Sequence, residues 1–145
     1  MPADTAAVIR ARVPFQPRHQ RPVLRLPGNA RIAVWTIVNV ENWNPGDPMP
    51  RTVVPPPMGQ ALLPDAPNWA WHEYGMRVGF WRFLETLAAR GLKASFAVNG
   101  SACAVYAEAC RAAVSAGWDF VGHGYVQRPM HRVDDQRAAI RDTIE

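Results

Sequence analysis

The sequence has no apolar run approaching the roughly 20 residues that a membrane-spanning helix requires. Its beginning also lacks a basic stretch followed by a continuous apolar segment, which is the pattern of a secretory signal. Charge of one sign is scarce as well, because 16 basic and 12 acidic residues leave a formal net charge of only +4. We therefore expect a cytoplasmic protein with neither a membrane nor a nucleic-acid partner. Its 145 residues provide for one domain with one core.

Cysteine is equally scarce, with only Cys103 and Cys110 present. In a continuous helix, a spacing of seven residues places their Cα atoms about 10 Å apart, which is too far for a disulfide. The spacing matches no metal-ligand or redox motif. We therefore expect two small, buried, apolar side chains.

The basic surplus is concentrated at the start of the chain, where six arginines fall within the first 31 residues among several prolines. Proline interrupts both helices and central strands, so residues 1–30 are expected to form an irregular leader. We interpret this leader as a solvated arm that packs on a domain spanning residues 31–145, the alternative being an arm that binds phosphate.

Apolar periodicity divides the domain into alternating strands and helices. It predicts strands at 32–38, 93–98 and 118–121, and helices at 77–90, at 102–116 and from an N-cap at Asp134 onward. The strands are almost continuously apolar, as in a sheet that is buried on both faces. The alternating order predicts an α/β fold with a parallel sheet and right-handed crossovers.

Residues 42–67 separate the first strand from the first helix and hold eight of the fourteen prolines. Such a segment is neither regular helix nor central strand. Structureless loops of this length are uncommon in compact domains unless they act as a lid or as part of a binding wall. We expect a surface loop that partly covers a site.

Polar side chains follow each predicted strand. Asn39 and Glu41 end the first strand, Asn99 follows the second, and His123 follows the third within Gly122-His123-Gly124-Tyr125. Because the carboxyl ends of parallel strands share one edge of a sheet, we expect these side chains to converge there.

Four segments together resemble the polysaccharide deacetylase superfamily, over about residues 31–145. They are Asn39-Val40-Glu41, Tyr74 to Arg82, Lys93 to Gly100, and Gly122 to Tyr125. The resemblance is closest to an intracellular branch that includes cofactor-independent allantoinases and related cyclic amide or imide hydrolases. It implies a distorted (β/α) barrel about twice this length, of which the chain would form the first half, and hydrolysis of an amide.

Metal-dependent members of that superfamily carry two aspartates after the first strand and two histidines four residues apart after the third. The resemblance places these roles on Asn39, Glu41, His123 and Gln127. A carboxamide such as that of Asn39 cannot act as a general base, and Gln127 offers zinc only a neutral oxygen. We therefore expect no cofactor. The alternative is a zinc site in which Glu41 and His123 are joined by His131.

These observations favour hydrolysis of a cyclic amide or ureide, with Glu41 and His123 as base and acid in turn. The side chains expected to contact the substrate are Asn39, Asn99, Arg77, Tyr125 and Gln127. Two alternatives stay open: a metal-dependent N-acetyl or polysaccharide deacetylase, and a truncated, non-catalytic relic or interaction module. Because half a barrel would expose an apolar sheet edge, we also expect a homo-oligomer.

Residues 72–79 allow two interpretations. His72 and Glu73 either reach the mouth of the site or form a cap with an aromatic packing patch. Arg77 is either presented to a substrate oxygen by a tight turn at 74–79 or solvated, with Gly75 and Gly79 permitting close helix packing.

Overall fold

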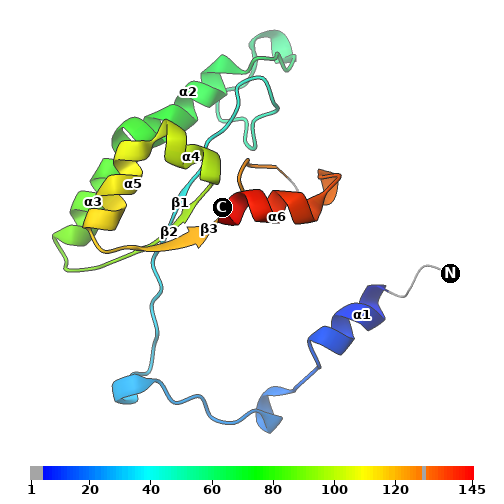
Figure 1. Ribbon diagram of the computed structural model, residues 1–145, viewed down its shortest axis with the longest axis vertical. Helices are drawn as coiled ribbons and strands as arrows, with labels where there is room; N and C mark the ends of the chain where they lie inside the picture. The colour runs from blue at the N-terminus through cyan, green and yellow to red at the C-terminus, as the bar shows by residue number, and fades with distance from the viewer. Residues whose placement is uncertain (1–4, 129) are drawn as a thin grey trace. The chain divides into compact units, whose positions relative to one another are not determined.

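The computed structural model describes residues 5–128 and 130–145, and the chain divides into two units, Met1–Val34 and Trp35–Glu145. The first unit contains helix α1 (Thr5–Arg12) and two 3-10 turns, Arg18–Gln20 and Pro27–Asn29 (Figure 1). The leader is therefore not wholly irregular, because the run before Pro14 is free to form a helix. None of the residues described in this unit is buried.

The second unit is built on a three-stranded parallel sheet in the order β1-β2-β3. The strands are β1 (Ile37–Val40), β2 (Ser95–Val98) and β3 (Asp119–Gly122). Their last residues lie in register across the sheet, and the three strands therefore end at one common edge. This arrangement confirms the expected α/β class with a parallel sheet.

The two outer strands are less buried than their sequences suggest. β2 is buried along its whole length, whereas every residue of β3 is exposed, and β1 is buried only at Val40. The expectation that residues 118–121 form a buried strand is wrong except at Trp118, which is 6% exposed. The first strand also begins five residues later than expected, and Ile32 is 77% exposed. Among the described residues, only β2 pairs with a strand on both sides, and that pairing accounts for the difference.

The core lies on one face of the sheet, where Val40, Phe96 and Val98 pack against two helices. These helices are α3 (Phe80–Ala88) and α5 (Ala107–Ser115). Aromatic rings fill the interface, and the small alanines that α5 contributes let that helix approach the sheet closely. The opposite face carries Ile37 and Val121, which are 45% and 40% exposed.

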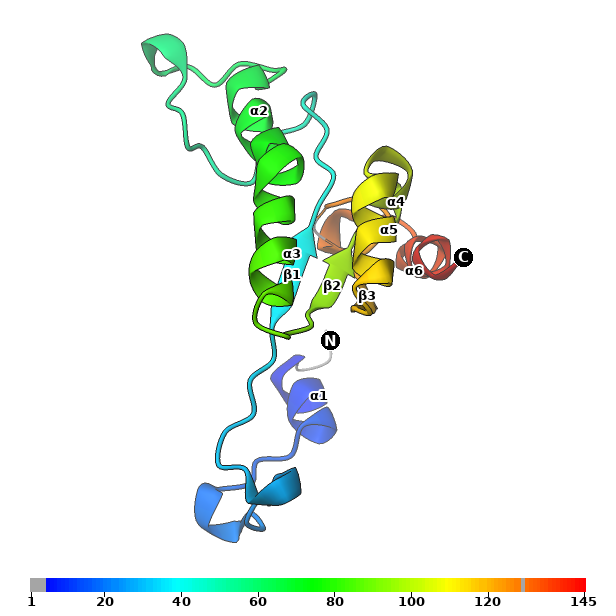
Figure 2. The ribbon, with the colours of Figure 1, turned by 90° about the vertical axis from the view of Figure 1, so that its left-hand side faces the viewer.

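The helix beside β1 is much longer than expected. Helix α2 (Ala66–Tyr74) continues through a π-helix (Gly75–Gly79) directly into α3 (Figure 2). Asp65 caps α2 by accepting a hydrogen bond from the Asn68 backbone N–H at 3.2 Å. Of the two interpretations of residues 74–79, the tight turn is therefore wrong. The expected stop at Gly91, with its φ of +62°, is confirmed.

The next helix is broken where one helix is expected. It consists of α4 (Gly100–Val105) and α5, separated at Tyr106, whose φ of −117° and ψ of 43° are not helical. The break leaves Cys103 exposed and Cys110 half-buried, which corrects the expectation of two buried thiols. Burial, followed by the neighbouring Cys103, raises the pKa of Cys110 to about 11.

The remaining segments are short or irregular. Between residues 42 and 65 the chain forms only a 3-10 turn at Pro57–Gly59 and no strand, as expected. Near the end, a 3-10 turn (Met130–Arg132) precedes helix α6 (Gln136–Ile144). Asp135 caps α6, not the expected Asp134, because its carboxylate accepts a hydrogen bond from the Ala138 N–H. No helix in the described ranges combines the length and apolar character needed to cross a bilayer.

Candidate functional site

The carboxyl edge of the sheet brings Glu41 and His123 into contact. Glu41 follows β1 and His123 follows β3, and His123 Nε2 lies 3.1 Å from Glu41 Oε1. Their side chains are 26% and 38% exposed, so the pair is accessible from solvent. This proximity is the one expected from parallel strands that end at a common edge.

Two further side chains hold the Glu41 carboxylate. Trp43 Nε1 donates to Glu41 Oε2 at 3.0 Å, and Gln127 Nε2 donates to Oε1 at 3.5 Å. Each carboxylate oxygen therefore has a donor, which fixes the orientation of the group toward His123. Sequence reasoning missed Trp43, whose only signal was a tryptophan two residues after Glu41 in a proline-rich segment.

Asn99 organises the loop that carries His123. Its side chain is completely buried, and its Nδ2 donates to the carbonyls of His123 at 2.6 Å and Gly124 at 3.3 Å. The same nitrogen donates to Gln127 Oε1 at 3.0 Å, while Asn99 Oδ1 accepts from the Asn42 N–H. A side chain without exposed area cannot touch a substrate, so Asn99 is a positioning residue and not the expected substrate contact.

Asn39 lies on the same edge but stands apart from the pair. It is an exposed residue of β1, opposite Ala97 of β2, and it lines the same cavity as Glu41. Within the described chain its side chain makes no hydrogen bond to Glu41 or His123. Asn39 is thus placed to meet a ligand but is not part of the hydrogen-bonded cluster.

Arg77 lies away from this site. Its side chain is 75% exposed on the π-helix, and its Nε lies 3.4 Å from Glu73 Oε2. Glu73 in turn accepts a hydrogen bond from the Tyr106 hydroxyl at the break between α4 and α5. Burial, reinforced by the Glu73 carboxylate, raises the pKa of Tyr106 well above its ordinary value. Glu73 therefore joins two helices instead of reaching the mouth of the site.

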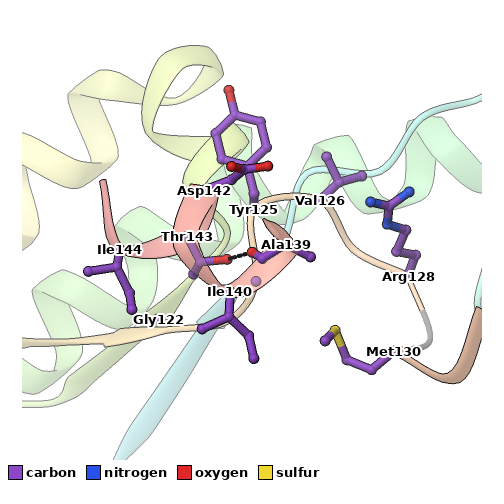
Figure 3. Close-up of a pocket in the computed structure, with 11 residues that line it drawn as sticks. Gly122, Tyr125, Val126, Arg128, Met130, Ala139, Ile140, Asp142, Thr143 and Ile144 are labelled. Carbon is purple, nitrogen blue, oxygen red and sulfur yellow. Dashed lines mark hydrogen bonds between the residues drawn. The ribbon is translucent and has the colours of Figure 1, made fainter. Parts of the chain in front are cut away.

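Tyr125 lines a different hollow, of about 560 Å³, between the end of β3 and α6 (Figure 3). Its ring lies against Gly100, where an added Cβ would come within 2.5 Å of the ring. Arg128 extends from the same loop, and Ile140 and Ile144 face the hollow from α6 (Figure 3). Tyr125 therefore lines a different hollow from the cavity that Glu41 lines.

The residues at the pair do not fit the zinc ion that the metal-dependent alternative requires. Gln127 Oε1 is taken by Asn99, so Gln127 turns its NH₂ group toward Glu41, and an amide nitrogen that carries two hydrogens is no metal ligand. His131 is exposed in the turn before α6. In the part of the chain that is described, no three histidine, cysteine, aspartate or glutamate side chains group closely enough to hold a metal.

A cavity of about 750 Å³ opens beside Glu41, between β1 and the long helix. Six aromatic rings line it. Four of them are called the aromatic wall below, namely Trp43, Trp71, His72 and Tyr74, and the other two are Phe80 and Phe83. His72 is flanked by Trp43 at 5.9 Å and by Trp71 at 5.5 Å between ring centroids. Trp69 holds the Trp43 backbone in place by donating its indole N–H to the Trp43 carbonyl at 3.0 Å.

The proline-rich segment is held in place at the other end of α2. Asn68, which is 2% exposed, accepts hydrogen bonds from the N–H groups of Val53 and Val54 at 2.7 and 2.8 Å. Its Nδ2 donates to the Val54 carbonyl at 3.0 Å. Of the described residues 42–67, Trp43 alone lines the cavity, so these contacts hold the segment to α2 and its expected role as a cover for the site stays a prediction.

Comparisons of the chain with protein-family models, with curated proteins and with solved structures gave no match.

Proposed function

We propose that the protein hydrolyses a non-peptide carbon–nitrogen bond in a cyclic amide or ureide. The observation that carries this proposal is the 3.1 Å contact between His123 Nε2 and Glu41 Oε1 at the carboxyl edge of a parallel sheet, beside a large cavity. The sequence resemblance to the allantoinase-like branch of the polysaccharide deacetylase superfamily supports it. On this proposal, the three strands are the first part of that superfamily's distorted barrel.

The pair can perform both proton transfers of the reaction. When Nε2–H donates to Glu41, the lone pair of the neutral imidazole lies on Nδ1, which takes a proton from the attacking water. Hydroxide adds to the carbonyl carbon, and the tetrahedral intermediate collapses as the imidazolium returns the proton to the departing ring nitrogen. Glu41 keeps the imidazole in the productive tautomer and stabilises its positive charge during the reaction.

Two carboxamides on this edge of the sheet suit a ureide ring, which presents alternating donors and acceptors. Asn39 is exposed in the cavity, and Gln127 directs its NH₂ group toward Glu41. On this proposal they bind the ring and polarise its carbonyl. The exposed apolar residues Ile37 and Val121 on the open face of the sheet further support self-association, which sedimentation velocity tests.

The experiment is a ring-opening assay on the purified full chain with hydantoin as the probe substrate, following the carboxylic acid that is released. We expect activity that survives chelator treatment and falls at least 100-fold in His123→Ala and Glu41→Gln. His131→Ala is the matched control and should retain activity. Activity that is lost in chelator and restored by zinc would instead favour a metal-dependent deacetylase.

A further inference from the structure

The aromatic wall begins at the reacting pair and plays no part in the proposed proton transfers. Trp43 touches Glu41 through its indole N–H and touches His72 through its ring. In a ligand whose amide reaches Glu41, the substituent next to that amide would therefore lie against the rings of Trp43 and His72. The volume of about 750 Å³ lies within the range of roughly 300–1,000 Å³ that is typical of small-molecule sites.

The wall offers flat rings to a ligand. Trp71 and Tyr74 are 50% and 53% exposed, while Trp43 and His72 are half-buried. Aromatic pairs favour offset or edge-to-face contacts at about 4.5–7 Å, and each contributes stability beyond the area it buries. A flat ring entering the cavity would extend the chain of contacts that already links Trp71, His72 and Trp43.

Two glycines make the helical side of the cavity flat. Gly75 and Gly79 lie about one turn apart and both line the cavity. An added Cβ at either position would meet no described atom within 4 Å, so close helix packing does not explain the glycines. Glycine within a helix is less favourable than alanine. A ring lying against the helix backbone accounts for both residues, because glycine permits the closest approach of a ligand to the main chain.

The charges and polar atoms around the cavity define the ligand further. Among the described residues that line it, Glu41 is the only carboxylate, and there is no lysine or arginine. An anionic group would therefore find no cationic partner there. His72 Nε2 is buried without a hydrogen-bond partner in the described chain, so a ligand in the cavity would contact His72 through its ring and not through this nitrogen.

We infer that the cavity binds a neutral aryl group attached to the ring that is hydrolysed, with Trp43 and His72 as the residues that determine specificity. This inference rests on the proposed function for the position of the scissile bond, but not for the binding of the aryl group. Trp43 also acts as a positioning residue through its hydrogen bond to Glu41.

The test compares 5-phenylhydantoin with unsubstituted hydantoin. We expect kcat/KM to favour the phenyl compound at least tenfold, mainly through KM. His72→Ala should reduce that preference to about twofold or less, and His72→Phe, which keeps a ring, should retain most of it. His131→Ala is the matched histidine control and should keep the wild-type preference. Equal kcat/KM values for the two compounds, or a preference unchanged in His72→Ala, would overturn the inference.

Binding measured separately keeps this inference distinguishable from the proposed function. The dissociation constant of 5-phenylhydantoin is measured by tryptophan fluorescence with the full-length Glu41→Gln variant, alone and combined with His72→Ala. Weaker binding in the double variant supports the aryl site even if neither compound is hydrolysed, a result that would refute only the proposed reaction. Identical dissociation constants would refute the aryl site even if hydantoin is hydrolysed.

Discussion

Replacing Asn99 tests whether one buried amide organises the site. In the native chain its Nδ2 donates to three oxygens, and its Oδ1 accepts one backbone N–H. A typical hydrogen bond contributes about 0.5–1.5 kcal/mol net, and a buried partner left unpaired costs about 1–3 kcal/mol. Because the loop oxygens are half-buried and water can reach some of them, we expect Asn99→Ala to lower the free energy of unfolding by about 3 kcal/mol.

Asn99→Asp makes the test specific, because it keeps the shape of the side chain but replaces the NH₂ group by an oxygen. That oxygen would face the His123 and Gly124 carbonyls and the Gln127 Oε1 atom, so every donated hydrogen bond becomes a repulsion. We expect Asn99→Asp to be less stable than Asn99→Ala in urea unfolding at pH 7. Asn39→Ala, at an exposed position, should change stability by less than about 0.5 kcal/mol. An Asn99→Asp variant within about 1 kcal/mol of wild type would refute the reasoning.

Four further predictions concern other residues. Gln127→His should raise zinc affinity at least tenfold in calorimetric titration, because an imidazole would replace an amide that turns its NH₂ group toward Glu41; unchanged affinity would contradict this geometry. Iodoacetamide at pH 8 should label the exposed Cys103 before Cys110, whose raised pKa of about 11 keeps it protonated, and a mass spectrum showing equal rates would argue against this. The same raised pKa predicts that Cys110 leaves the free energy of unfolding unchanged below about pH 9 and lowers it as pH rises from 9 toward 11, because the thiol then ionises more readily in the unfolded chain. Cys110→Ala should remove this part of the pH dependence in urea unfolding. Asn68→Ala should speed proteolysis near Val53, since it removes the hydrogen bonds that hold the segment to α2; an unchanged cleavage rate would refute that role.

The sequence predicts the order and direction of the strands well, because apolar runs and glycine stops are local signals. The contact between Glu41 and His123 follows from them, since parallel strands that end together bring residues 82 positions apart to one edge. Neither the family resemblance nor the reaction gains independent support from the comparisons, and both stay predictions.

Features that depend on distant contacts could not be predicted in this way. The alanine-rich run after Asn99 suits one continuous helix, yet it breaks at Tyr106, whose hydroxyl bonds Glu73 on another helix. Proline density suggested a loop up to residue 67, whereas the Asp65 cap starts a helix there, with Pro67 in its first turn, where proline is tolerated. Strand burial likewise depends on how many neighbours a strand has, which no local pattern records.

The π-helix between α2 and α3 determines which way the side chains of α2 face relative to those of α3. Its closing hydrogen bond runs from the Phe80 N–H to the Gly75 carbonyl, so the segment accommodates one residue more than an α-helical turn would. Removing one residue there would rotate everything before it by about 100° relative to α3. His72 would then leave the cavity and Glu73 would leave Tyr106, while Phe80 kept its place in the core. The π-helix thus sets the rotation of α2 relative to α3. Because of this rotation, α3 packs in the core while α2 lines the cavity of the candidate site.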